Sequence, residues 1–187
     1  MKKSALALGL IGLVSLPTFA AGIDGGAYVG GGLSVYQGSD TDSAPSLDSS
    51  GMGYNLYGGY QFNRIVGVEL GYNDYANYKN NYEDLSPTSI SVSANLGYTF
   101  DNTIRPFVLA GLSSVDLNAS SGSGFDDDSG TGFHFGVGVE YSPIEHLTLR
   151  AISQADAVSV DNTIGGKTYS NDTLAFNSVS FGGSYDF

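Results

Sequence analysis

The sequence contains no cysteine and no tryptophan, and basic residues are scarce. Without cysteine, the chain can form neither disulfides nor the lipidated cysteine of a lipoprotein. Lysine and arginine number 7 against 19 aspartates and glutamates, which gives a net charge of −12 at pH 7. No basic patch exists to displace counterions from a phosphate backbone, so the composition argues against nucleic acid as a partner.

Long apolar runs are also missing, apart from a short one at the N-terminus. Lys2 and Lys3 precede this run, and Thr18 and Ala20 provide small residues at its end. This pattern is typical of a secretory signal peptide, and the run is shorter than the roughly 20 apolar residues of a transmembrane helix. We expect cleavage after Ala20, which leaves one domain over residues 21–187. In that domain five basic residues face nineteen acids, a net charge of −14.

The last fourteen residues mostly alternate between two kinds of side chain. Phe187, Tyr185, Phe181 and Val179 share one parity, whereas the other holds small and polar residues such as Ser180. A period of two predicts a strand with two unlike faces. Without a candidate transmembrane helix, a membrane location leaves only a closed barrel, because every backbone polar group must be bonded there.

Seven earlier segments show the same alternation, and each has about the 9–11 residues that a tilted strand needs to cross a bilayer. They are residues 27–36, 53–62, 65–75, 89–100, 105–116, 132–141 and 147–158. An even number of such segments predicts an all-β, eight-stranded antiparallel up-and-down transmembrane barrel with its apolar face outward. The alternative is a soluble lipocalin-like barrel, which would need the apolar face inside.

The phase of each segment predicts which side chains enter the lumen. Glu69, Glu140, Arg150 and Asp156 fall on the polar phase. In segment 105–116 the alternation is looser. There we expect the outward side chains to be Phe107, Leu109 and Val115, with Arg105 outward near the strand end and with Val108 and Leu112 on the other face.

The connections between the segments alternate in length. Residues 63–64, 101–104 and 142–146 are short turns, whereas 36–52, 77–88, 117–131 and 159–173 are long and acidic. Short periplasmic turns and longer extracellular loops are expected of such barrels, so both termini are predicted to be periplasmic. Asp126, Asp127 and Asp128 have the oxygen ligands that calcium prefers, but they lack the spacing of a calcium loop, so solvated charge is the favoured interpretation.

Three stretches carry a resemblance to a known family. Residues 58–72 (GGYQFNRIVGVELGY), 136–150 (GVGVEYSPIEHLTLR) and 94–98 (ANLGY) resemble two hairpins and the fourth strand of the OmpA-type outer-membrane barrel. The wider outer membrane protein beta-barrel group includes the opacity and Ail/OmpX-like proteins. The resemblance implies a barrel alone, without the peptidoglycan-binding domain that many relatives append.

The resemblance also implies a network of charged side chains in the lumen. Its matching positions are Glu69, Glu140 and Arg150, and the fourth-strand lysine of the family is replaced by Asn95. Arg150 would then face two carboxylates, so one of them should bind a proton or be supported by Asn95, Gln154 or water. A charge in so narrow an interior must be paired. A structural plug is favoured over a gate.

Catalysis is not indicated, and no cofactor or metal site is predicted. Some barrels of this size modify lipid A with histidine, serine and an acid, but this chain has only 2 histidines. His134 has the lumenal phase, and Phe135 and Gly136 follow it with no serine nearby, so we expect a polar filler. His146 lies in a short turn and is interpreted as a solvated residue.

The resulting hypothesis is an integral protein of the Gram-negative outer membrane with a structural or adhesin-like role. It would expose four acidic loops, contact outer-membrane lipid and lipopolysaccharide, bind host or surface ligands through the loops, and remain a monomer. The alternative is a narrow, porin-like channel, and a lipid A-modifying enzyme ranks third.

Overall fold

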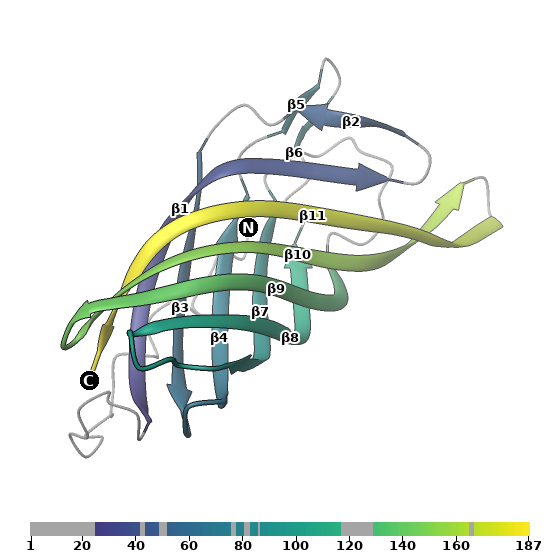
Figure 1. Ribbon diagram of the computed structural model, residues 1–187. Helices are drawn as coiled ribbons and strands as arrows, with labels where there is room; N and C mark the ends of the chain where they lie inside the picture. Colours follow the sequence, from purple (N-terminus) through teal and green to yellow (C-terminus); the bar gives the residue numbers. More distant parts are fainter. Residues whose placement is uncertain are drawn as a thin grey trace, which may run out of the picture.

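A computed structural model describes residues 25–41, 44–48, 52–75, 78–80, 83–85, 87–116, 129–164 and 167–187 of the chain. Eight of its strands form one closed antiparallel barrel, which confirms the fold predicted from the alternation (Figure 1). The barrel strands are β1 (Gly26–Thr41), β3 (Gly53–Gln61), β4 (Val66–Asp74), β7 (Thr88–Gly97), β8 (Ile104–Asp116), β9 (Ser129–Ile144), β10 (Leu147–Ile164) and β11 (Lys167–Asp186).

The barrel closes where the last strand pairs with the first. β11 runs antiparallel to β1 from the Tyr28–Asp186 pair to the Thr41–Leu174 pair, with one register shift between Ser34 and Tyr36. In Figure 1 the yellow β11 lies beside the purple β1 along most of its length. Closure leaves no open strand edge, which the apolar interior of a bilayer requires.

The strands differ in length more than the sequence pattern predicted. β3 and β4 have 9 residues each, whereas β10 has 18 and β11 has 20. The predicted loop 159–173 is therefore wrong for most of its length, because the β10–β11 ladder continues to the Ile164–Lys167 pair. Other parts of the predicted loops hold the short strands β2 (Ala44–Asp48), β5 (Tyr78–Asn80) and β6 (Glu83–Leu85). No helix in the described ranges is long and apolar enough to cross a membrane.

The outer surface is apolar and the lumen is mostly polar, as the alternation predicted. Exposed outward residues include Leu33, Leu56, Leu70, Val92, Phe135, Leu149 and Phe181. Buried inward residues include Ser91, Ser93, Asn95, Gln154, Ser178 and Ser180. Lipid therefore solvates the apolar side chains that the core of a soluble protein would bury.

Strand β8 corrects the predicted phase. Phe107 and Leu109 point inward and are only 2% and 3% exposed, whereas Val108 and Leu112 are 45% and 57% exposed. Val115 is also buried. The physical reason is space beside the ring: Gly138 pairs with Phe107 on the neighbouring strand β9, and a Cβ there would come within 2.7 Å of the Phe107 ring. Bare glycine backbone thus makes room for an inward aromatic side chain.

Candidate functional site: the polar lumen

The lumen has two ends that differ in their connections. The turn end carries the short connections and the C-terminal residue, and the loop end carries the opposite ends of the strands. Two clusters of polar side chains lie between these ends. We call Glu69, Asn95, Arg105, Glu140 and Arg150 the charged layer, and Tyr75, Ser89, His134 and Asp156 the histidine layer.

The charged layer joins strands across the barrel. Arg150 Nη2 donates to Glu69 Oε2 at 2.9 Å, and its Nε lies 3.5 Å from Glu140 Oε1. Asn95 Nδ2 also donates to Glu69 Oε2, at 3.2 Å, and Tyr28 Oη donates to the same oxygen at 2.7 Å. Glu69 is therefore held by three different donors, which stabilises its charge in a buried site.

Arg105 is the member of this layer that the sequence analysis missed. It was expected outward, yet it is 7% exposed, and its Nη1 donates to Glu140 Oε2 at 2.9 Å. Its Nη2 donates to Asn95 Oδ1 at 2.8 Å. The expectation of one cation for two acids is therefore wrong, because two arginines balance Glu69 and Glu140. The parity of Arg105 with Phe107 was the available signal, and the wrong phase of β8 concealed it.

Arg150 is held by rings as well as by carboxylates. Its guanidinium carbon lies 4.1 Å from the ring centroid of Tyr57 and 4.4 Å from that of Phe107. Planar guanidinium groups stack favourably on aromatic faces, by about 2 kcal/mol or more where both are desolvated. Ring contacts and ion pairs together leave this side chain little freedom to move.

The histidine layer is built around one carboxylate. His134 Nδ1 lies 2.8 Å from Asp156 Oδ1, while Ser89 Oγ and Tyr75 Oη donate to Asp156 Oδ2 at 2.7 and 2.5 Å. His134 and Asp156 are adjacent across the β9–β10 ladder, and Ser89 comes from β7 on the other side of the barrel. Sequence spacing could not reveal this cluster, because its members meet only when the barrel closes.

Gln154 lies between the two layers, and its hydrogen bond goes to an amide and not to a carboxylate. Its side-chain amide donates to Asn73 Oδ1, and Asn73 in turn donates to Ser89 Oγ at 3.2 Å. The expected support of Glu69 or Glu140 by Gln154 is therefore not observed. A small cavity of about 10 Å³ lies beside Gln154, and Glu69, Arg150 and His134 also line it.

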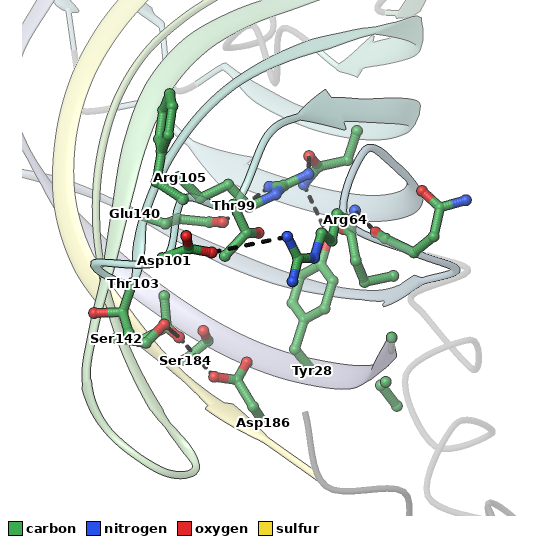
Figure 2. Close-up of a pocket in the computed structure, with 18 residues that line it drawn as sticks. Tyr28, Arg64, Thr99, Asp101, Thr103, Arg105, Glu140, Ser142, Ser184 and Asp186 are labelled. Atoms are coloured by element: carbon green, nitrogen blue, oxygen red, sulfur yellow. Dashed lines mark hydrogen bonds and ion pairs between the residues drawn. The ribbon is translucent and has the colours of Figure 1, made fainter. Parts of the chain in front are cut away.

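A larger cavity of about 230 Å³ opens at the turn end, and we call it the vestibule (Figure 2). Arg105, Glu140 and Tyr28 line it, so it reaches the charged layer. At its wall Ser142 Oγ contacts Thr148 Oγ1 at 2.7 Å, and Thr148 donates to Asp186 Oδ2 at 2.6 Å. Nearer the turns, Arg64 Nη1 lies 3.9 Å from Asp101 Oδ1. Figure 2 shows these two side chains pointing towards each other.

Within the part of the chain that the structure describes, the polar clusters do not assemble an activated nucleophile. Ser89 donates to Asp156 and not to His134, so the order of contacts in a Ser–His–Asp triad is not reproduced. Among the described residues, no group of three histidines and acids could hold a metal ion. Asp126, Asp127 and Asp128 lie outside the described residues, so their predicted state stays a prediction.

His146 is more ordered than the predicted solvated turn residue. It adopts a left-handed backbone conformation with a φ of 66°. Its ring stacks on Tyr185 at 5.5 Å, and its Nδ1 lies 2.6 Å from the backbone oxygen of Asp186. The turn between β9 and β10 therefore clamps the end of β11.

A closed eight-stranded barrel with an apolar outer face and a polar lumen defines a small outer-membrane protein. Comparison with known families agrees: residues 6–187 match the outer membrane protein beta-barrel domain, and the chain belongs to this family. This membership implies a location in the Gram-negative outer membrane.

The relatives found by sequence carry one name. Outer membrane protein A of Shigella flexneri is 29% identical over 180 residues, which cover 88% of this chain and 51% of the relative. Outer membrane protein A of Escherichia coli O157:H7 is 29% identical over 161 residues, which cover 80% and 46%. The chain thus spans about half the length of the curated relatives it matches.

Solved structures show the same fold. Neisserial surface protein A superposes with a TM-score of 0.68 at 21% identity, covering 86% of this chain and 97% of that one. Ail of Yersinia pestis, in complex with the heparin analogue sucrose octasulfate, gives a TM-score of 0.59 at 18% identity, covering 88% and 99%. The names of these four proteins are those of outer-membrane and surface proteins, and none is that of an enzyme.

Proposed function

We propose that this protein is a structural and surface-interacting barrel of the outer membrane, and not an enzyme, and that its own side chains plug its lumen. The observation that carries the proposal is the charged layer, in which Arg150 pairs with Glu69 across the barrel and Arg105 pairs with Glu140 on the neighbouring strand. An eight-stranded barrel is just wide enough for side chains to fill. These residues fill it with neutralised charge.

The plug resists opening because each charge depends on its partner. A solute that passed the charged layer would have to separate buried ion pairs, and breaking such a pair costs about 3–5 kcal/mol. Arg150 would also have to leave the faces of Tyr57 and Phe107. This combination favours a plug over a gate that opens often.

We further propose that both termini are periplasmic and that the loop end faces the outside. The described turns are short, and the strands of the β9–β10–β11 wall extend towards the loop end. The outer face contacts lipid, and lipopolysaccharide surrounds the loop end. We propose a monomer, with contacts to host or surface ligands made by the acidic loops.

The negative charge of the chain indicates which kind of ligand its loops could bind. Ail was crystallised with a heparin analogue, so a polysulfated ligand binds that protein. The present chain has 19 acids and 7 basic residues, so a polysulfated ligand would be repelled unless divalent cations bridge the two. Cationic surface groups fit the acidic loops better.

A narrow channel is the second candidate, and the vestibule is the observation that favours it. This cavity of about 230 Å³ opens one end of the lumen to water as far as Arg105 and Glu140. If the charged layer rearranged, an acidic mouth would make the pore prefer cations.

Single-channel conductance measurements distinguish the plugged barrel from the narrow channel. Purified barrel in planar bilayers should be silent in potassium chloride at several pH values. The double variant Arg105→Ala/Glu140→Ala removes one ion pair of the plug, and we expect short openings from it. Stable conductance steps from the wild type would reject the plug in favour of the channel.

Adherence tests the surface-interacting role. Bacteria that express the wild type should bind a cationic surface more than bacteria that express Asp126→Asn/Asp127→Asn/Asp128→Asn at equal surface levels. Equal binding by the two strains would show that Asp126, Asp127 and Asp128 do not contribute to the proposed contact. Unchanged lipid A mass spectra on expression are expected for a protein without lipid A chemistry.

A further inference from the structure

The vestibule ends inside the barrel at the charged layer. Asn95, Arg105 and Glu140 line its inner end, and Asn95 and Arg105 are 1% and 7% exposed. Beyond them the ion pair of Arg150 with Glu69 continues the plug. With the lumen plugged as proposed above, the vestibule is a pocket that a solute enters and leaves through the turn end.

The inner end of this pocket presents an acceptor with unused capacity. Glu140 Oε2 accepts from Arg105 Nη1 at 2.9 Å, whereas among the described residues Glu140 Oε1 has only a 3.5 Å contact with Arg150 Nε. That contact is long for a hydrogen bond between charged groups, which usually measures about 2.7–2.9 Å. The side chain of Glu140 is 13% exposed and lines the vestibule, so a donor in the pocket can approach it.

Arg105, the cation at the same depth, already has its acceptors. Its Nη1 donates to Glu140 Oε2, its Nη2 donates to Asn95 Oδ1 at 2.8 Å, and its Nε is buried. An anion that entered the vestibule would have to displace one of these acceptors. The inner end therefore favours a hydrogen-bond donor over an anion.

A second carboxylate lies nearer the opening of the vestibule. Asp186 Oδ2 accepts from Thr148 Oγ1 at 2.6 Å, and no lysine or arginine pairs with Asp186 in the described ranges. Figure 2 shows Asp186 and Glu140 among the side chains that line the cavity. Three carboxylates and two guanidinium groups line it in total, which leaves one net negative charge.

The two carboxylates lie at different depths. On β10, Arg150 is paired with Glu140, and the backbone oxygen of His146 accepts from the Asp186 amide. Arg150 and His146 are four positions apart in the chain, which corresponds to about 13 Å along an extended strand. A ligand that contacts both acids must therefore be elongated and must carry a donor at each end.

We propose that the vestibule binds an elongated aliphatic polyamine, with one ammonium group on Glu140 and another on Asp186. An ammonium group has three donors, and the hydroxyl oxygens of Ser142 and Ser184 are further acceptors in the lining. The methylene segments would pack against Ala27. This inference rests on the proposed plug and adds a binding activity to it.

The size of the pocket fits a slender ligand. Its volume of about 230 Å³ lies below the roughly 300–1,000 Å³ that is usual for pockets of drug-sized ligands. A flexible chain of methylene and ammonium groups is narrow enough for such a space. A bulky cation of the same charge would not reach Glu140 at the inner end.

An organic cation fits the pocket better than a metal ion does. A metal ion needs several ligands around one point, and the described residues contain no group of three histidines and acids that could hold one. Glu140 and Asp186 instead offer single carboxylates at separate depths. The excess of 19 acids over 7 basic residues in the chain also favours the approach of cations.

The first test is calorimetric titration of spermidine into the refolded barrel in an uncharged detergent at low salt. We expect saturable binding at one site. Asp186→Asn and Glu140→Gln each remove one charged acceptor, and each should weaken binding by about 10–100-fold, the usual effect of losing a charged hydrogen bond. Glu145→Gln makes the same change of charge in an exposed turn at the same end, outside the lining, and should keep the wild-type affinity.

A protection experiment locates the site without changing either carboxylate. The chain has no cysteine, so Ser142→Cys places a single thiol on the wall of the vestibule, and Met52→Cys places one at the exposed loop end. Spermidine should slow the reaction of Ser142→Cys with N-ethylmaleimide severalfold. The reaction of Met52→Cys should keep its rate. Heat-modifiability on gels verifies that each variant is a folded barrel.

The outcomes separate the binding site from the plug on which it rests. A lack of saturable spermidine binding overturns the site and leaves the plug intact. Wild-type affinity in folded Asp186→Asn, or protection of Met52→Cys in place of Ser142→Cys, also overturns it, because the polyamine then binds elsewhere. Entry of radiolabelled spermidine into liposomes through the barrel would instead contradict the plugged lumen.

Discussion

At the scale of the residue, small differences in side-chain size decide what the lumen can hold. Gly58 and Gly59 are neighbours in β3, but only Gly59 lies against a ring, that of Tyr28 on the neighbouring strand β1. A Cβ on Gly59 would lie 2.5 Å from the Tyr28 hydroxyl and even closer to the backbone oxygen of Val68. A Cβ on Gly58 would lie 3.4 Å from its nearest neighbour, which is ordinary contact.

These two glycines give a matched pair of variants. Gly59→Ala should lower the free energy of unfolding by about 1–3 kcal/mol, as overpacking of a filled interior usually does. Gly58→Ala should leave it nearly unchanged. Urea unfolding followed by gel mobility measures both, and equal losses in the two variants would contradict the inward position of Gly59.

Arg105 is the residue whose role changes most between sequence and structure. Arg105→Met leaves Glu140 with only the 3.5 Å contact to Arg150. We expect a loss of about 3–5 kcal/mol, the usual cost of leaving a buried charge without its partner.

The double variant Arg105→Met/Glu140→Gln completes this test. It removes both charges of the pair, so it should recover part of the stability lost in Arg105→Met. Additive losses in the double variant would show that the two side chains do not interact. Because the chain has no tryptophan, circular dichroism and gel mobility replace tryptophan fluorescence as measurements.

At the scale of the element, the alternation predicted most strands well and one of them in the wrong phase. In β7, isoleucine, valine and leucine alternate with serine and asparagine, so its two faces could not be confused. In β8 both faces carry large apolar residues, because the lumen itself holds Phe107 and Leu109. Periodicity cannot assign the two faces of such a strand, because the inner face packs a ring against a guanidinium and the outer face contacts lipid, so both are apolar.

A pair of alanine variants in β8 tests the corrected phase. Phe107→Ala removes a ring that contacts Arg150 inside the barrel, and a loss of about 3–5 kcal/mol is expected for a buried phenylalanine. Val108→Ala changes an outward side chain in contact with lipid, and it should cost much less. Refolding yield and urea midpoints are the measurements. A larger loss in Val108→Ala than in Phe107→Ala would support the phase predicted from the sequence, with Phe107 outward.

At the scale of the whole molecule, the unequal strands make the two ends of the barrel different. The turn end has short connections, and its β9–β10 turn clamps the end of β11 through His146. The β1, β10 and β11 strands extend further towards the loop end than β3 and β4 do (Figure 1). This asymmetry underlies the proposed orientation.

The absence of cysteine makes the orientation simple to measure. Met52→Cys places a single thiol at the loop end, where Met52 is exposed, and Glu145→Cys places one in an exposed turn at the other end. Intact cells treated with a membrane-impermeant maleimide should label Met52→Cys only. Labelling of Glu145→Cys alone would show that the barrel has the opposite orientation in the membrane.

The class of the protein could be predicted from the amino-acid sequence alone. A period of two recurs in eight segments, and that pattern is visible in one dimension because neighbouring residues in a strand face opposite sides. The inward positions of Glu69, Asn95, Glu140 and Arg150 follow from the same parity. Which of these inward side chains meet depends on the three-dimensional arrangement of the strands. Arg105 reaches Glu140 and Asn95 on its two neighbouring strands because β8 turns this side chain inward, a phase that periodicity did not assign. Ser89 reaches the His134–Asp156 pair because the closed barrel brings β7 to face β9 and β10 across one narrow lumen.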